Sequence, residues 1–97
     1  ERKNVSANGF IEATILITPK GNIHNRPLIT FRGLPIYEKE EFQNGLEDEI
    51  DRTVKSFSLN NKKQETNLVD ALKSTCRKFT KLKTGKRPLA NINLVRI

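Results

Sequence analysis

Two side chains in this sequence could act as a nucleophile or a base, His24 and Cys76, and each residue type occurs only once. A zinc site or a nucleophilic pair needs several such groups at short spacing, as in HxxH or CxxC, and the sequence has neither motif. His24 lies in a loop-like stretch near a proline, so we expect a surface or packing role. Cys76 lies at the edge of an apolar helical stripe, so we expect a half-buried thiol without a partner base. The chain alone therefore offers no catalytic constellation.

A group of acidic residues at positions 47–51 could suggest a divalent-metal site. On a helix, however, Glu47, Asp48 and Glu49 point in directions about 100° apart, so they do not converge on one ion. A solvated helix face is the better interpretation. A glycine-rich phosphate loop is also missing, because the glycines at 33, 45 and 85 are isolated.

Anion binding is the chemistry that the residue types favour most. The chain has 18 Lys and Arg against 11 Asp and Glu, a net charge of +7. Residues 76–88 hold six Lys or Arg and no acid, whereas seven of the eleven acids lie between positions 38 and 51. This polarity suits oriented docking on RNA, DNA or an acidic protein face. The candidate contacts to RNA phosphates are Lys73, Arg77, Lys78, Lys81, Lys83, Lys86 and Arg87.

The same cations also have a structural explanation. Up to Leu82 they lie on the predicted last turns of an amphipathic helix, with Phe79 and Leu82 pointing inward. Cations are favourable at the negative C-terminal end of a helix dipole, whatever else they contact. From Lys83 to Pro88 they form the passage into the last strand. RNA contact is therefore not needed to account for the charge.

The fold that must support these residues is predicted to begin with a strand at residues 10–18. Apolar and polar side chains alternate there, with Ile11, Ala13, Ile15 and Ile17 on one side, which predicts a strand with one buried face. Turn residues at 19–22 and a second strand at 28–33 predict an antiparallel hairpin with an irregular entry at 24–27. Residues 89–97 are predicted to form the last strand.

From Glu38 onward the apolar residues recur at helical spacing, which predicts a helix. Gly45 is unfavourable in the interior of this helix, and we interpret it as the point where a neighbouring element approaches closely. After a polar connection at 58–65 a second helix is predicted, capped by Thr66 or Asn67 and ended by Gly85. The two apolar stripes are Phe42, Leu46, Ile50, Thr53, Val54 and Phe57, and then Leu68, Ala71, Leu72, Thr75, Phe79 and Leu82.

The order β-β-α-α-β predicts an α+β fold, a two-layer sandwich in which a small three-stranded sheet carries both helices on one face. The other sheet face is left for solvent or a partner. Residues 1–9 are interpreted as the end of a linker and residues 10–97 as a single domain. The absence of methionine favours the interpretation that this chain is a piece of a longer protein. The lone cysteine favours an intracellular setting. No apolar run approaches the roughly 20 residues of a membrane span.

Taken in order, these features resemble the C-terminal domain of bacterial ribonuclease J over residues 9–97. The resemblance is carried by Arg32-Gly33, Tyr37, Phe79 and the Lys-Arg-Pro at 86–88. It implies a non-catalytic accessory domain of a cytoplasmic, metal-dependent ribonuclease that acts in RNA processing and decay. In such enzymes the preceding metallo-β-lactamase and β-CASP domains hold two zinc ions, so no cofactor is expected in this chain. The implied partners are those catalytic domains, further copies in a homo-oligomer, and RNA.

Two functions are compatible with this pattern, an assembly module that uses the uncovered sheet face and an RNA-affinity module that uses the cations. The alternative interpretation is a stand-alone small basic α+β nucleic-acid-binding module unrelated to ribonuclease J.

Overall fold

The middle strand of the sheet is β1 (Phe10–Ile17), which lies between β2 (Ile23–Arg32) and β3 (Leu89–Arg96). The computed structural model describes residues 9–20, 22–57 and 62–97. Successive side chains of a strand point to opposite faces, and Ile11, Ala13, Ile15 and Ile17 are all buried. β1 pairs antiparallel with β2 and parallel with β3. The predicted buried face of this strand and the predicted hairpin are both confirmed.

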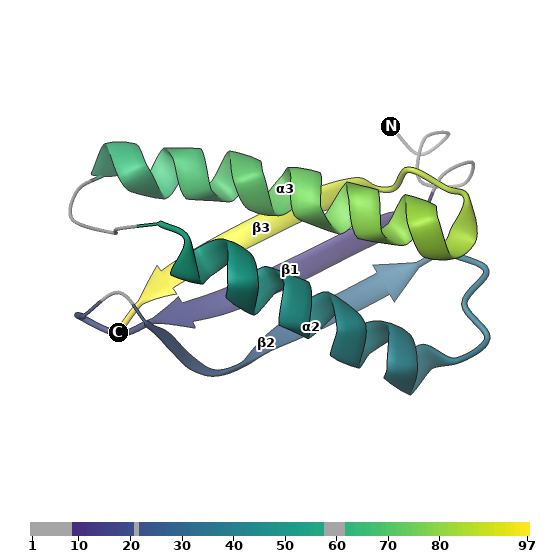
Figure 1. Cartoon of the computed structure of the whole chain (residues 1–97), viewed down its shortest axis with the longest axis horizontal. Coiled ribbons are helices and arrows are strands. Elements are labelled where there is room, and N and C mark those ends of the chain that lie inside the picture. The colour runs from purple at the N-terminus through teal and green to yellow at the C-terminus, as the bar shows by residue number, and fades with distance from the viewer. Residues whose placement is uncertain (1–8, 21, 58–61) are drawn as a thin grey trace.

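Both helices, α2 (Lys39–Lys55) and α3 (Lys62–Thr84), lie on the same face of the sheet (Figure 1). Each helix buries a row of side chains spaced four residues apart, the ridge with which helices commonly pack. The row is Phe42, Leu46, Ile50 and Val54 in α2, and Leu68, Leu72, Cys76 and Thr80 in α3. The predicted α+β two-layer arrangement with the order β-β-α-α-β is therefore confirmed in the described residues.

Strand β2 begins at Ile23, five residues before the predicted start. Its pairing with β1 is interrupted, since Thr14 pairs with Leu28 whereas Leu16 pairs with His24. The intervening segment contains Asn25 at φ 61° and the buried Pro27. A residue at positive φ and a proline both commonly interrupt strands, so the sequence pattern predicted the start of β2 too far along the chain. An edge strand tolerates them, because a bulge and a missing N–H disturb only one neighbour.

Helix α3 begins at Lys62, so the prediction that Thr66 or Asn67 caps it was wrong. Residues 62–65 are lysine, glutamine and glutamate, which are strong helix formers, and the helix continues through them. Only residues 58–61 of the predicted polar connection lie outside the described residues. The C-terminal end agrees with the prediction. Gly85 takes φ 79° and its N–H donates to the Lys81 carbonyl at 2.8 Å, which closes the last turn.

Two side chains of α3 differ in burial from the prediction. Cys76 is fully buried instead of half-buried, and Leu82 is 85% exposed instead of inward-facing. The cause is that α3 packs through side chains four residues apart. Because one residue turns about 100°, each four-residue step moves the buried row about 40° around the helix. The row therefore drifts toward Cys76 and Thr80 near the end of the helix, and Leu82 on the opposite edge is left in solvent.

Gly45 marks a close approach, as predicted. A Cβ placed on it would lie 2.7 Å from Cζ of Phe79. The Phe79 ring contacts Phe42 with a centroid distance of 5.3 Å, and Phe42 contacts Phe31 of β2 at 5.4 Å. A line of three aromatic rings thus connects the edge strand to both helices.

Candidate functional site

Five of the seven cations expected to contact RNA gather on the outer side of α3. They line a hollow of about 420 Å³, together with Ser74 and a single acid, Asp70. We call this the α3 basic surface: Lys73, Arg77, Lys78, Lys81 and Arg87. Positions 73, 77 and 81 form a four-residue row of their own, about 100° around α3 from the buried row. Arg87 is added by the segment that leads from α3 to β3.

The other two predicted cations lie elsewhere. Lys83 points to the opposite side of α3, where its Nζ lies 5.6 Å from the centroid of the Phe79 ring. Lys86 is exposed after Gly85, but it does not line the hollow. The structure therefore brings together five of the seven residues and separates Lys83 from them.

The cations of the α3 basic surface are available to an external anion. Within the part of the chain that the structure describes, none of the five forms an ion pair with a carboxylate. The ion pairs seen there join Arg26 to Glu47, Arg52 to Glu49, Lys55 to Asp51 and Arg96 to Glu65. Ammonium and guanidinium groups that are not neutralised by neighbours can bind phosphate oxygens. The surface suits anion contact.

The two reactive residue types are not placed for nucleophilic chemistry. Cys76 is buried, and this burial raises the pKa of its thiol from 9.0 to about 12, so the reactive thiolate is suppressed. His24 is exposed on β2. Among the described residues, no three His, Cys, Asp or Glu side chains lie close enough together to hold a metal ion. In the same residues no helix is sufficiently long and apolar to cross a membrane.

Among the residues that the structure describes, no helix or loop covers the sheet face opposite the helices (Figure 1). Side chains that point to it include Leu28, 69% exposed, and Val95, 41% exposed, with Phe10, Leu16 and Leu89 half-buried. At its centre Glu12 accepts hydrogen bonds from the side-chain amides of Asn91 at 3.0 Å and Asn93 at 3.4 Å. We call this surface the open sheet face: Phe10, Glu12, Thr14, Leu16, His24, Leu28, Thr30, Arg32, Leu89, Asn91, Asn93 and Val95. It combines apolar patches with an internally bonded polar centre.

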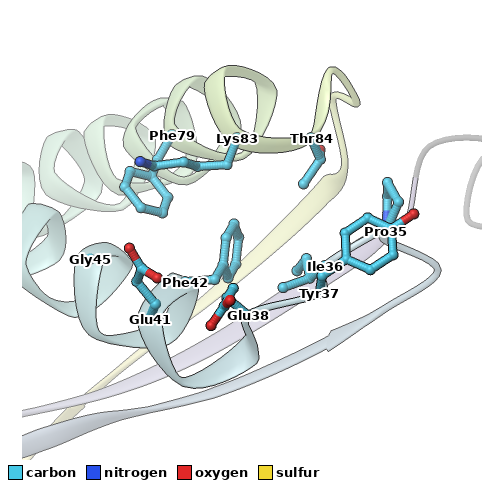
Figure 2. Close-up of a pocket in the computed structure, with 10 residues that line it drawn as sticks. All are labelled: Pro35, Ile36, Tyr37, Glu38, Glu41, Phe42, Gly45, Phe79, Lys83 and Thr84. Carbon is cyan, nitrogen blue, oxygen red and sulfur yellow. The ribbon is translucent and has the colours of Figure 1, made fainter.

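A second hollow, of about 390 Å³, lies between the start of α2 and the end of α3 (Figure 2). The rings of Phe42 and Phe79 face it, and Lys83 and Thr84 approach it from α3. We call it the α2–α3 pocket: Pro35, Ile36, Tyr37, Glu38, Glu41, Phe42, Gly45, Phe79, Lys83 and Thr84. The sequence did not predict this pocket, because its walls come from three separate segments. The only sequence signal for it was Gly45.

The model of one protein family, described as the ribonuclease J C-terminal domain, matches residues 1–97, the whole chain. The chain belongs to this family. The resemblance to ribonuclease J drawn from the sequence is thereby confirmed. In this ribonuclease J C-terminal domain, Tyr37 and Phe79, two of the positions that carried the resemblance, both line the α2–α3 pocket. A search of curated proteins found no match.

Proposed function

We propose that this chain is a non-catalytic accessory domain of a metal-dependent ribonuclease J that acts in RNA processing and decay. In this proposal the open sheet face docks on the preceding catalytic domains of the same chain and supports their assembly and activity. The observation that carries the proposal is the uncovered face, on which Leu28 and Val95 are exposed to solvent.

The composition of the open sheet face fits a domain contact within one chain. Interfaces between domains are more polar than those of obligate dimers. Here Glu12 and its two asparagine partners occupy the centre, Thr30 of β2 lies beside Glu12, and apolar side chains lie toward both ends of the strands. A partner tethered to the same chain is present at high effective concentration, which further strengthens docking on a mixed face of this kind.

In this proposal the two zinc ions of the enzyme are held by the preceding catalytic domains. A two-metal site needs several histidine and carboxylate ligands. This chain has a single histidine, His24, and its described residues contain no group of three such ligands. The residues present do not fit the metal pair, so no zinc-dependent step is assigned to them.

The docking proposal predicts that exposed apolar residues of the open sheet face determine binding to the catalytic domains. The test measures calorimetric binding of this chain to the same ribonuclease expressed without it. Leu28→Glu and Val95→Glu should each weaken binding by about tenfold or more, because each buries a carboxylate in the contact. Leu82→Glu makes the same kind of change on the helix layer and should leave binding unchanged. Equal binding by all of these chains, or no binding of the unaltered chain, would refute the proposal.

A second candidate function, contact with RNA phosphates, is favoured by the gathering of five cations around one hollow. Such contact is independent of sequence and depends strongly on salt, since each phosphate neutralised on a single strand contributes about −0.7 to the slope of log K against log salt. We propose that the α3 basic surface contributes this kind of affinity to the enzyme.

Arg77→Ala combined with Lys81→Ala is expected to weaken binding of a short single-stranded RNA and to reduce the magnitude of the salt slope by about 1.4 if each cation contacts one phosphate. Fluorescence anisotropy at low and at physiological ionic strength measures both quantities. Arg52→Ala combined with Lys55→Ala is the matched control, because it removes the same charge from exposed positions of α2. If the control loses as much RNA affinity as the Arg77 and Lys81 variant, or if the unaltered chain does not bind RNA at low salt, the proposed RNA contact of the α3 basic surface is refuted.

A further inference from the structure

In the described part of the chain the sheet has two edge strands, and only β3 is regular. β3 pairs with β1 in an unbroken register over Leu89–Arg96, without a proline. In β2, the other edge strand, a bulge, Asn25 at φ 61° and Pro27 interrupt the pattern. Such interruptions commonly protect an edge, because the unpaired N–H and C=O groups of a regular edge can bind a further strand. The β2 edge is protected in this way and the β3 edge is not.

Every second residue of β3 directs its backbone groups to the outside of the sheet. The N–H of Leu89 donates to the Gly9 carbonyl at 3.1 Å, and Ile97 donates in the same way at the other end of β1, at 3.0 Å. Odd-numbered residues therefore bond to β1, and the residues between them turn their N–H and C=O groups away from it. These include Ala90, Ile92 and Leu94, whose side chains pack in the helix layer. A further strand can bond to them in the ordinary ladder pattern.

Helix α3 presents cations on the same side of the molecule as this edge. It packs on β3 and also contacts α2 (Figure 1). The Thr75 hydroxyl is bonded to that of Thr53 at 2.9 Å, so Thr75 faces α2. Thr75 and Arg77 lie about 100° to either side of the buried Cys76, so Arg77 faces away from α2. Arg77 and Lys73, one turn earlier, therefore lie on the side of α3 that is turned toward the β3 edge.

These charges determine which kind of segment suits the edge. Arg87 lines the same hollow as Lys73 and Arg77, so cations lie both along α3 and at the start of β3. They attract carboxylates on the helix side of an added strand. Successive side chains of a strand alternate between its faces, so the residues between the acids point to the other side. There they lie beside Leu89 and Val95, where apolar side chains are favoured. The suitable segment is extended, with alternating acidic and apolar residues.

We propose that the β3 edge binds such a segment of another protein as a fourth strand of the sheet. Backbone hydrogen bonds hold the segment, and the α3 basic surface pairs with its carboxylates. The β2 edge does not compete, because α2 presents Glu47, Asp48 and Asp51 beside it. RNA uses the cations but not the free backbone groups, so the edge favours a protein partner. The inference does not depend on docking by the open sheet face, and it makes the segment and RNA competitors for the same cations.

The first test uses a short synthetic peptide of alternating valine and glutamate that is long enough to span β3. Fluorescence anisotropy at low ionic strength should show that it binds the chain. One modified peptide is N-methylated at every glutamate and another at every valine, so each loses the N–H groups of one edge. One of them should bind about tenfold or more weakly and the other like the original, because only one edge of the peptide faces β3. Equal affinity of the two modified peptides, or no binding of the original, would overturn the proposal.

The second test alters the edge of the chain. Ala90→Pro removes an outward N–H and leaves the ladder with β1 intact, so it should weaken peptide binding by about tenfold and leave RNA binding unchanged. Ala90→Ser keeps the N–H and is the matched control. Undiminished peptide binding by Ala90→Pro contradicts the proposal. Circular dichroism reports whether this variant is folded, and if it is not, the modified peptides decide.

A third comparison separates this proposal from the RNA contact. Lys73→Ala combined with Arg77→Ala should weaken peptide binding, whereas Arg52→Ala combined with Lys55→Ala removes the same charge from α2 and should not. Peptide binding that is equally weak in both variants would mean that the α3 basic surface does not select the segment. If the chain binds the peptide but not RNA, only the RNA contact fails, and if it binds RNA but not the peptide, only the added strand fails.

Discussion

Replacing Thr80 by valine is expected to stabilise the domain by about 1–3 kcal/mol. Thr80 is fully buried at the end of the α3 row, and its hydroxyl has no hydrogen-bond partner among the described residues. A buried hydroxyl without a partner has lost its hydrogen bonds to water and has not replaced them with hydrogen bonds in the protein. Valine has nearly the same shape and is also branched at Cβ, so the change removes the polar group and leaves the packing and the helix propensity almost unaltered.

Urea and thermal unfolding measure this effect directly. For a domain of this size, each kcal/mol raises the melting temperature by about 4–8 °C. Thr75→Val is the matched control, because the Thr75 hydroxyl is 2.9 Å from that of Thr53 on α2 and forms a hydrogen bond with it. That variant should lose about 0.5–1.5 kcal/mol. A Thr80→Val chain that is no more stable than the original would show that the Thr80 hydroxyl is satisfied in solution.

The sequence was sufficient to predict the fold because each buried face follows one clear period. The two-residue alternation of β1 identified Ile11, Ala13, Ile15 and Ile17, and all four are buried. The helical spacing from Glu38 identified the α2 row in the same way, and Gly45 marked the approach of Phe79. In each of these segments local preference and tertiary packing agree, which is the condition under which a pattern specifies a structure.

The predictions failed where tertiary context decides. A stripe assigned from sequence treats all positions on one side of a helix as equal, but the packed row in α3 shifts about 40° around the helix at each four-residue step. That drift buries Cys76 and Thr80 and exposes Leu82, and it depends on where the neighbouring elements lie. The early start of β2 has a similar origin, since only its position at the sheet edge makes Asn25 and Pro27 acceptable in a strand.

The candidate site was likewise predictable from the sequence only in part. The cations on the outer side of α3 could be grouped from sequence, because helical spacing alone places positions 73, 77 and 81 together. The sequence could not show that Arg87 joins them while Lys83 turns toward Phe79. The α2–α3 pocket was not foreseen, because Ile36, Phe42 and Phe79 meet only when the two helices have packed.

The buried thiol of Cys76 is expected to make the domain lose stability at alkaline pH. Burial raises the pKa of this thiol from 9.0 to about 12. Above pH 9 the unfolded chain releases the thiol proton while the folded chain retains it, so the unfolded state is increasingly favoured as the pH rises from about 9 to about 12. Below pH 9 the thiol is protonated in both states and has no effect. At about pH 10.5 the loss amounts to about 2 kcal/mol, because each pH unit above 9 contributes about 1.4 kcal/mol.

Comparison with Cys76→Val isolates this contribution. All other ionisable groups are present in both chains, so only the difference between the two pH profiles reports the thiol. Urea unfolding near pH 8 and near pH 10.5 should show the original chain losing about 2 kcal/mol more than the variant. Valine fills a similar volume, so the two chains should differ little near pH 8. Parallel profiles would mean that the Cys76 thiolate is solvated in the folded domain, and that the end of the α3 row is open to water.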